Sequence, residues 1–146
     1  MQRALYDVAQ LLRMNQKELD DLFSASEFGP IPDGQADGTA IIAPGRVYSA
    51  EIATLINHFA WQGKVFDAKS GTLKNRIGPF GFNAIIAKVY KAPSWLDEKE
   101  CIVLDYSETS LVAHWVRDEI RQISPQFYLG KVYWDKNRLI DFSLKF

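Results

Sequence analysis

The chain has 146 residues, 17 basic and 18 acidic side chains, a formal net charge of −1 and one cysteine. A chain of this length is expected to form one domain and to bury roughly 68–70% of its unfolded surface, enough for a stable core without disulfide bonds or bound metal ions. The balanced charge lacks the excess of Lys and Arg that is typical of nucleic-acid or anionic-membrane binding, and a single cysteine excludes an intrachain disulfide.

The hydrophobic runs indicate neither a targeting signal nor a membrane element. Asp7, Gln10 and Arg13 interrupt every apolar run near the N-terminus before the core of a signal peptide could form. No stretch approaches the ~20 apolar residues of a membrane span. Together with the lone cysteine, which suits a reducing compartment, these features predict a cytoplasmic protein that does not span a membrane.

Two short helices are predicted at the start of the chain, within about residues 2–24. In the first, over residues 2–13, apolar residues recur with a helical period. They are Ala4, Leu5, Val8, Leu11 and Leu12. In the second, Asn15 is the expected N-cap and Glu18 completes a capping box. The apolar face of this second helix consists of Leu19, Leu22 and Phe23.

Residues 28–46 are rich in glycine and proline. This composition predicts an extended loop rather than a central strand, because proline removes a hydrogen-bond donor and glycine adds backbone entropy. A short strand over Thr39–Ala43 is the exception. Ser49 is then a good N-cap for a third helix at about 49–61.

From Gly63 onward the hydrophobic period changes to two, which is typical of strands. Lys64–Asp67 and Thr72–Ile77 are predicted to form a hairpin around a turn at residues 68–71. Further strands are expected at Phe82–Lys91, Glu100–Ser107, residues 113–123, Phe127–Trp134 and Arg138–Phe146.

Seven or eight antiparallel strands after two or three helices predict a mainly-β chain whose strands close, or nearly close, into a barrel. The expected organisation is a single barrel domain spanning residues 1–146. Eight strands can just enclose one small ligand, so this fold leaves both a ligand-holding and a filled barrel open.

Several catalytic and metal-binding patterns are missing from the sequence. No glycine-rich phosphate loop ends in Gly-Lys-Ser/Thr, and no G-x-G-x-x-G follows a predicted strand. The only Cys and His residues are Cys101, His58 and His114, so neither a metal nor another cofactor is expected. Cys101 opens a strand and is interpreted as a buried apolar thiol; a nucleophilic pair with His114 is the alternative.

The run Arg117–Arg121 is the densest cluster of charge and the main indication of a site. On a strand, Arg117, Glu119 and Arg121 point to one side, whereas Asp118 and Ile120 point to the other. Asp118 is therefore predicted to face an apolar interior, where it could have a shifted pKa or bind a polar ligand group. The alternative is a solvated ladder of cross-strand charges, with Asp118 bonded to backbone or to a hydroxyl.

Other polar and aromatic residues could converge with Asp118 inside a barrel, although core packing is the alternative for the aromatic ones. Tyr106 and Tyr128 each carry a hydroxyl on a predicted strand, and a buried tyrosine usually finds a partner for it. The ligand-binding candidates are Asp118, Arg117, Arg121, Tyr106, Tyr128, Trp115 and Asn75, and the catalytic candidates are Asp118 and Glu119.

Several strings of residues occur together in a known group of proteins: GPIPDG, AIIAPG, WQGKVFD, PSWLDEKECIVLDYS and FYLGKVYW. From about Gly29 to Phe146 the chain resembles uncharacterised bacterial lipocalin-like proteins of about this length, of the calycin type. The resemblance implies a small antiparallel barrel whose relatives commonly hold an apolar small molecule. It implies no catalytic residue.

Three functions are compatible with the sequence. The first is binding of a small, mainly apolar ligand inside the barrel, with its polar group oriented by Asp118, a tyrosine and an arginine. The second is a cofactor-free enzyme of the isomerase, cyclase or hydratase type acting on a hydrophobic substrate, with Asp118 or Glu119 as general base. The third is a structural or interaction protein with a solid barrel.

Overall fold

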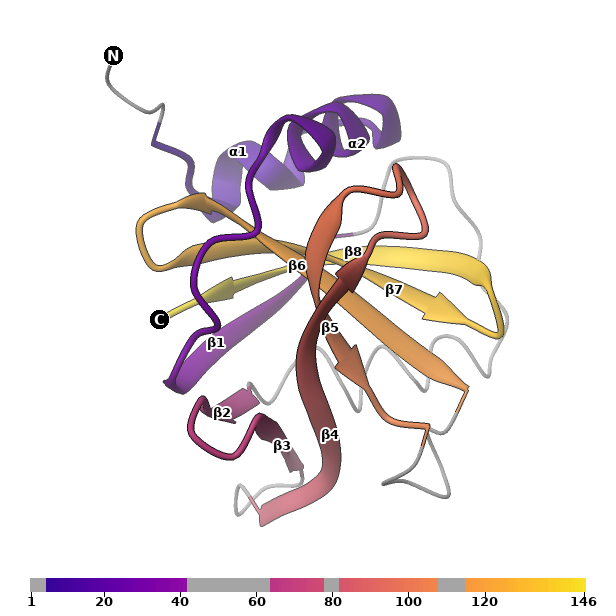
Figure 1. Ribbon diagram of the computed structural model, residues 1–146. Helices are drawn as coiled ribbons and strands as arrows, with labels where there is room; N and C mark the ends of the chain where they lie inside the picture. Colours follow the sequence, from indigo (N-terminus) through magenta and orange to yellow (C-terminus); the bar gives the residue numbers. More distant parts are fainter. Residues whose placement is uncertain (1–4, 42–63, 78–81, 108–114) are drawn as a thin grey trace.

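The computed structural model describes residues 5–41, 64–77, 82–107 and 115–146, and among them the side chains of 75–77 and 82–86 are outside the description. Eight strands form one closed antiparallel barrel in which each strand pairs with its neighbours in the chain and β1 pairs with β8 (Figure 1). The strands are β1 (Gly34–Ile41), β2 (Lys64–Asp67), β3 (Thr72–Ile77), β4 (Phe82–Pro93), β5 (Glu100–Asp105), β6 (Val116–Ser124), β7 (Phe127–Trp134) and β8 (Asn137–Lys145). The predicted mainly-β barrel is confirmed.

The predicted hairpin of β2 and β3 is confirmed, with both strands at their predicted bounds. Asp67 pairs with Thr72 at the turn, and Gly71 has a positive φ of 66°, which glycine adopts without a steric cost. The three strands predicted at the C-terminal end of the chain, where apolar and polar residues alternate most clearly, are also present as β6, β7 and β8. In β8 the register pairs Phe142 with Gly130 of β7 on one side and Ala40 of β1 on the other.

The segment that the composition predicted to be a loop contains a central strand. β1 begins at Gly34, earlier than the predicted Thr39, and pairs with β2 through Gly34–Ala36 and with β8 through Asp37–Ile41. Backbone pairing on both sides compensates for the low strand propensity of glycine. Ala36 and Ala40 are buried, so β1 places small side chains on the inner wall.

The first predicted helix is shorter than its sequence pattern suggested. α1 spans Val8–Leu12 and begins at an N-cap, Asp7, whose side chain accepts from the Gln10 amide. Of the described residues of the predicted apolar stripe, only Leu11 is fully buried, whereas Leu5 is 73% and Leu12 48% exposed. A polar cap at Asp7 starts the helix where the hydrophobic period alone would have continued it backward.

The second helix agrees with its prediction. α2 spans Gln16–Ala25, and Asn15 and Glu18 form the expected capping box. Leu19 and Phe23 are fully buried. In Figure 1 both helices lie together on the outside of the barrel, close to β6. The predicted helix at 49–61 lies outside the described residues.

The buried apolar residues form two clusters separated by the barrel wall. The inner one lies inside the barrel and includes Phe66, Leu104, Ile120, Phe142 and Leu144. The outer one lies between the wall and the helices; it consists of Leu11, Leu19, Phe23, Ile41, Cys101, Val103, Ile123, Phe127 and Leu129. β5 to β8 are therefore buried on both faces.

One end of the lumen is filled by aromatic side chains. Tyr128 and Phe146 lie edge to face with ring centroids 5.5 Å apart, and Phe146 packs in the same way on Phe66 at 5.4 Å. The Tyr128 hydroxyl donates to the Pro30 carbonyl at 2.7 Å, which ties the segment before β1 across this end. Phe28 also packs against the lumen cluster.

No helix among the described residues is long and apolar enough to cross a membrane.

Candidate functional site

Three polar side chains meet inside the barrel: Lys64, Tyr106 and Asp118. Lys64 is the first residue of β2, Asp118 lies on β6, and Tyr106 directly follows β5. In the circular strand order β2 and β6 are four positions apart out of eight, so Lys64 and Asp118 extend from opposite walls. Lys64 and Asp118 are each 3% exposed and Tyr106 is fully buried.

The Lys64 ammonium is the centre of this group. Its Nζ donates to the Tyr106 hydroxyl at 3.1 Å and lies 3.7 Å from Asp118 Oδ2. The Tyr106 hydroxyl in turn donates to the same carboxylate oxygen at 3.5 Å. Lys64 Nζ is also 5.7 Å and 5.9 Å from the ring centroids of Tyr106 and Phe142. Both aromatic faces are therefore close to the buried cation.

Burial shifts the titration of both charged partners. Desolvation raises the pKa of Asp118 to about 6, although Lys64 and the Tyr106 hydroxyl both act to lower it. Desolvation also lowers the pKa of Lys64 from its ordinary value, against the opposing effect of the Asp118 charge. A buried ion pair costs more in lost hydration than a surface pair, which explains why desolvation dominates both shifts.

One oxygen of Asp118 has no hydrogen-bond partner. Asp118 Oδ2 faces Lys64 and Tyr106, whereas Oδ1 is buried and unpaired. Buried polar atoms without a partner are rare in native proteins, because each costs about 1–3 kcal/mol. This atom is therefore a buried acceptor that receives no hydrogen bond from the described side chains around it.

The predicted alternation of β6 is confirmed, but the outward charges are not a solvated ladder. Glu119 and Arg121 are fully buried. Glu119 accepts from Ser94 Oγ at 2.6 Å, from the Trp95 amide at 2.8 Å and from Arg117 Nε at 3.1 Å. The loop after β4 covers these charges. The alternation of residues along β6 shows which side chains share a face, but it cannot show that a distant loop buries that face.

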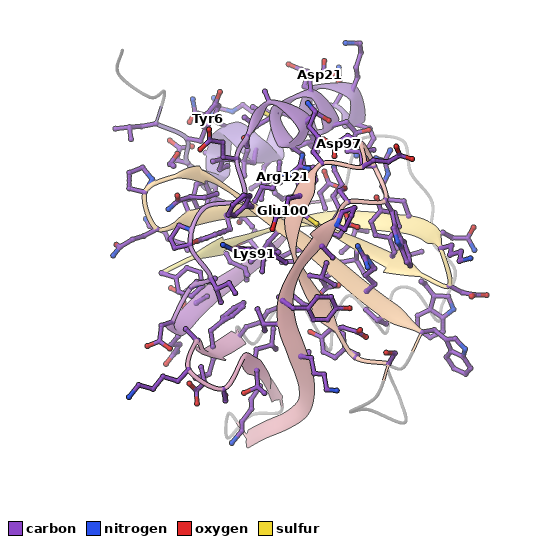
Figure 2. The ribbon with its side chains drawn as sticks, viewed as in Figure 1. Tyr6, Asp21, Lys91, Asp97, Glu100 and Arg121 are labelled. Atoms are coloured by element: carbon purple, nitrogen blue, oxygen red, sulfur yellow. The ribbon has the colours of Figure 1, made fainter. Side chains whose placement is uncertain are left out.

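Arg121 ties three segments together on the outer wall. Its guanidinium binds both carboxylate oxygens of Asp97 at 2.6 and 2.7 Å, and it also donates to the carbonyls of Phe23, Lys99 and Glu100. Figure 2 shows Arg121, Asp97 and Glu100 close together beside the helices. The hydrogen bond from Arg121 lowers the pKa of Asp97. These contacts assign Arg121 to the packing of α2.

A second ionic group lies under the same helix. Lys131 is fully buried and its Nζ contacts Asp141 Oδ2 at 2.9 Å and Asp20 Oδ1 at 2.7 Å. Arg138 pairs with the other oxygen of Asp20 at 2.9 Å. The charges on the outer wall thus join the helices to the barrel and lie on the opposite side of the wall from the lumen group.

The remaining candidates are dispersed. Tyr128 lines the lumen but bonds Pro30 at the aromatic end instead of joining Asp118. Trp115 is 50% exposed and stacks at a tilt on Trp134, with centroids 5.7 Å apart. Asn75 pairs in register with Lys64, but its side chain is outside the description. His58 and His114 lie outside the described residues.

Cys101 is packed in the outer cluster. Its thiol is fully shielded from solvent, and burial raises its pKa to about 12. A thiol with so high a pKa carries almost no thiolate at neutral pH, which agrees with the interpretation of Cys101 as an apolar residue. Within the described part of the chain, no three Cys, His, Asp or Glu residues are grouped to hold a metal ion.

Lys64 was missed by the sequence reasoning. Its only signal is that it shares a strand face with Phe66, and the other face of this short strand carries Val65 and Asp67. Each face of this four-residue strand carries one charged and one apolar residue, so the sequence does not show which face points inward. The pairing of Lys64 with Ala36 of β1 decides the matter, and this pairing depends on a strand that composition did not predict.

Comparisons with known proteins support the fold without naming a function. No protein-family model matches the chain, and no match was found among curated proteins. The crystal structure of a protein from Thermomonospora curvata is similar, with a TM-score of 0.63 and 15% sequence identity over 94% of this chain and 91% of the other. At this identity the similarity shows a shared fold alone.

Proposed function

We propose that the barrel binds a small, mainly apolar molecule whose polar group contacts Lys64, Tyr106 and Asp118. The observation that carries this proposal is the unpaired Asp118 Oδ1, a buried acceptor among mainly apolar described side chains. Ligand sites in proteins combine mostly apolar walls with a few converging polar groups, and this lumen has that composition. Lipocalin-like barrels are the class of binding protein with which the architecture is compatible.

The position of the polar group also supports binding. Aromatic residues and the Tyr128–Pro30 hydrogen bond occupy one end of the barrel. Lys64, Val116 and Tyr106 lie near the other end, where β1 ends and β2 begins. The polar group and the aromatic end thus lie at different levels of the lumen, which suits a ligand with one polar and one apolar end.

Mass spectrometry under native conditions tests the proposal. Protein purified from its own host is measured intact and then extracted with organic solvent. A co-purifying small molecule that is released by extraction is the expected result. The emission of Trp134, which packs partly buried against the lumen cluster, provides a second measurement during titration with apolar compounds. A ligand-free mass together with no response to any compound would overturn the proposal in favour of a solid barrel.

A cofactor-free enzyme is the second candidate, and the raised pKa of Asp118 favours it. A carboxylate with a pKa of about 6 is closer to the optimum for proton transfer at neutral pH than an ordinary aspartate. Lys64 and the Tyr106 hydroxyl would stabilise negative charge that develops on a substrate. Glu119 takes no part in this proposal, since its carboxylate binds Ser94, Trp95 and Arg117 outside the barrel.

Replacing Asp118 by Asn separates the two candidates once a ligand is identified. If the protein is an enzyme acting on that compound, Asp118→Asn is expected to reduce turnover by at least about a hundredfold while binding persists. Unchanged turnover in this variant would remove Asp118 from the mechanism.

A further inference from the structure

We infer that the polar group of the bound molecule is a hydrogen-bond donor, such as a hydroxyl or an N–H, that donates to Asp118 Oδ1, and that it is not a carboxylate. This inference rests on the proposed ligand binding in the lumen. It adds the chemical class of the ligand's polar group. This class predicts how the binding affinity of a probe changes when its polar end is varied and its hydrocarbon chain is kept.

The unpaired atom sets the direction of the hydrogen bond. An ionised carboxylate only accepts, so the group that satisfies Asp118 Oδ1 has to donate. A ligand ether or ester would leave this oxygen unpaired and would add further acceptors to the lumen. An alcohol or an amide N–H satisfies it, and hydrogen bonds to charged groups are the stronger ones.

The charge of the group argues against a carboxylate ligand. Among the described side chains inside the barrel, one positive and one negative charge face each other, with Lys64 Nζ 3.7 Å from Asp118 Oδ2. A ligand carboxylate would add a second negative charge near Asp118 in a region lined by apolar side chains. Glu119, on the outer face of the same strand, already raises the pKa of Asp118 through its own negative charge. Burying an unbalanced charge is far more costly than burying a neutral donor.

Three probes with similar hydrocarbon chains test the class of ligand: decan-1-ol, its isomer 1-methoxynonane, and decanoate. The alcohol donates and accepts, the ether only accepts, and decanoate is a charged acceptor. Calorimetric titration at pH 7.5 is expected to show decan-1-ol binding at least about tenfold more tightly than either of the other two. Equal affinities of alcohol and ether, or tightest binding of decanoate, would overturn the inference and leave ligand binding intact. Binding of none of the three would overturn both.

A variant that removes the polar group provides the control. In Lys64→Met/Tyr106→Phe/Asp118→Leu the three polar side chains become apolar ones of similar size, a replacement that buried ion pairs often tolerate. The alcohol and the ether should then bind within about twofold of each other. A persisting tenfold preference would place the acceptor elsewhere and overturn the inference.

The single variant Asp118→Asn is the second control. It keeps the shape of the side chain but makes the acceptor neutral, so the preference for the alcohol should fall severalfold, because hydrogen bonds to neutral acceptors are weaker. An unchanged preference in this variant would also contradict the inference, even if the triple variant failed to fold.

Discussion

Arg121 and Asp97 form a bidentate ion pair on the outer wall of the barrel, with both N–O distances at or below 2.7 Å. Arg121 lies on β6 and Asp97 in the loop after β4, and the same guanidinium reaches the Phe23 carbonyl near the end of α2. One side chain thus joins a strand, a loop and a helix. Since the Arg121 side chain has no exposed surface, water cannot replace its partners.

Replacing Arg121 by Met should therefore destabilise the protein strongly. The variant removes the charged partner of Asp97 and the hydrogen bonds to the carbonyls of Phe23, Lys99 and Glu100. Breaking a buried ion pair typically costs about 3–5 kcal/mol. Urea unfolding at pH 7 measures the free energy. Lys17→Met is the matched control, because Lys17 pairs with Asp21 on the surface of α2 and should show no measurable change. Equal effects of the two substitutions would contradict the assigned role of Arg121.

Gly130→Ala is expected to destabilise the barrel by about 1–3 kcal/mol, the usual cost of overpacking a core. A Cβ at Gly130 would overlap the ring of Phe142, its register partner on β8. Denaturant unfolding of Gly130→Ala, Phe142→Leu and the double variant forms a cycle that isolates the clash. The double variant should be more stable than the sum of the two single effects; simple additivity would show that the ring moves aside without cost.

The stability of the wild type relative to Asp118→Asn should depend on pH. The pKa of Asp118 is about 6 in the folded protein and 3.8 as the ordinary value, so the folded state holds this proton over a pH range in which the unfolded chain has lost it. The contribution of Asp118 to stability is thus fully present below pH 4 and is lost as the pH rises through 6. The difference in unfolding free energy between wild type and variant should fall by about 3 kcal/mol over this range.

Urea titrations of both proteins at pH 4, 5, 6 and 7 measure this difference. Taking the difference cancels the other carboxyl groups, including Asp97, whose lowered pKa acts in the opposite sense. A difference that stays flat or increases with pH would show that burial does not raise the pKa of Asp118.

The thiol of Cys101 should be unreactive in the native protein. It is fully buried under the helices, and its raised pKa of about 12 leaves little thiolate at pH 8. Reaction with a thiol reagent such as Ellman's reagent at pH 8 should be at least about a hundredfold slower in buffer than in urea. Rapid reaction without urea would show that the helices open readily from the outer wall.

The elements that were predicted correctly are those in which local pattern and tertiary position agree. The turn of the β2–β3 hairpin is specified by glycine at a positive φ, and β8 alternates cleanly because its two faces contact different surroundings. The placement of Asp118 on the inner face followed from the same two-residue period. These predictions depend only on residues that are close to one another in the sequence.

The errors arose where distant segments decide the outcome. β1 is a strand because β2 and β8 pair with it on both sides, although its own residues favour a loop. Glu119 and Arg121 are buried because a loop and a helix cover them, which the alternation of β6 cannot reveal. Lys64 enters the site only because closure of the barrel places β2 opposite β6.

Closure of the barrel also limits how this protein can meet other proteins. Every strand of the described barrel pairs with a neighbour on each side over at least part of its length, so none is an edge strand. Addition of a peptide as a further strand, and edge-to-edge association of two copies, both use an edge strand, which this closed arrangement lacks. A protein partner would then recognise side chains on the helices, the loops or the outer wall.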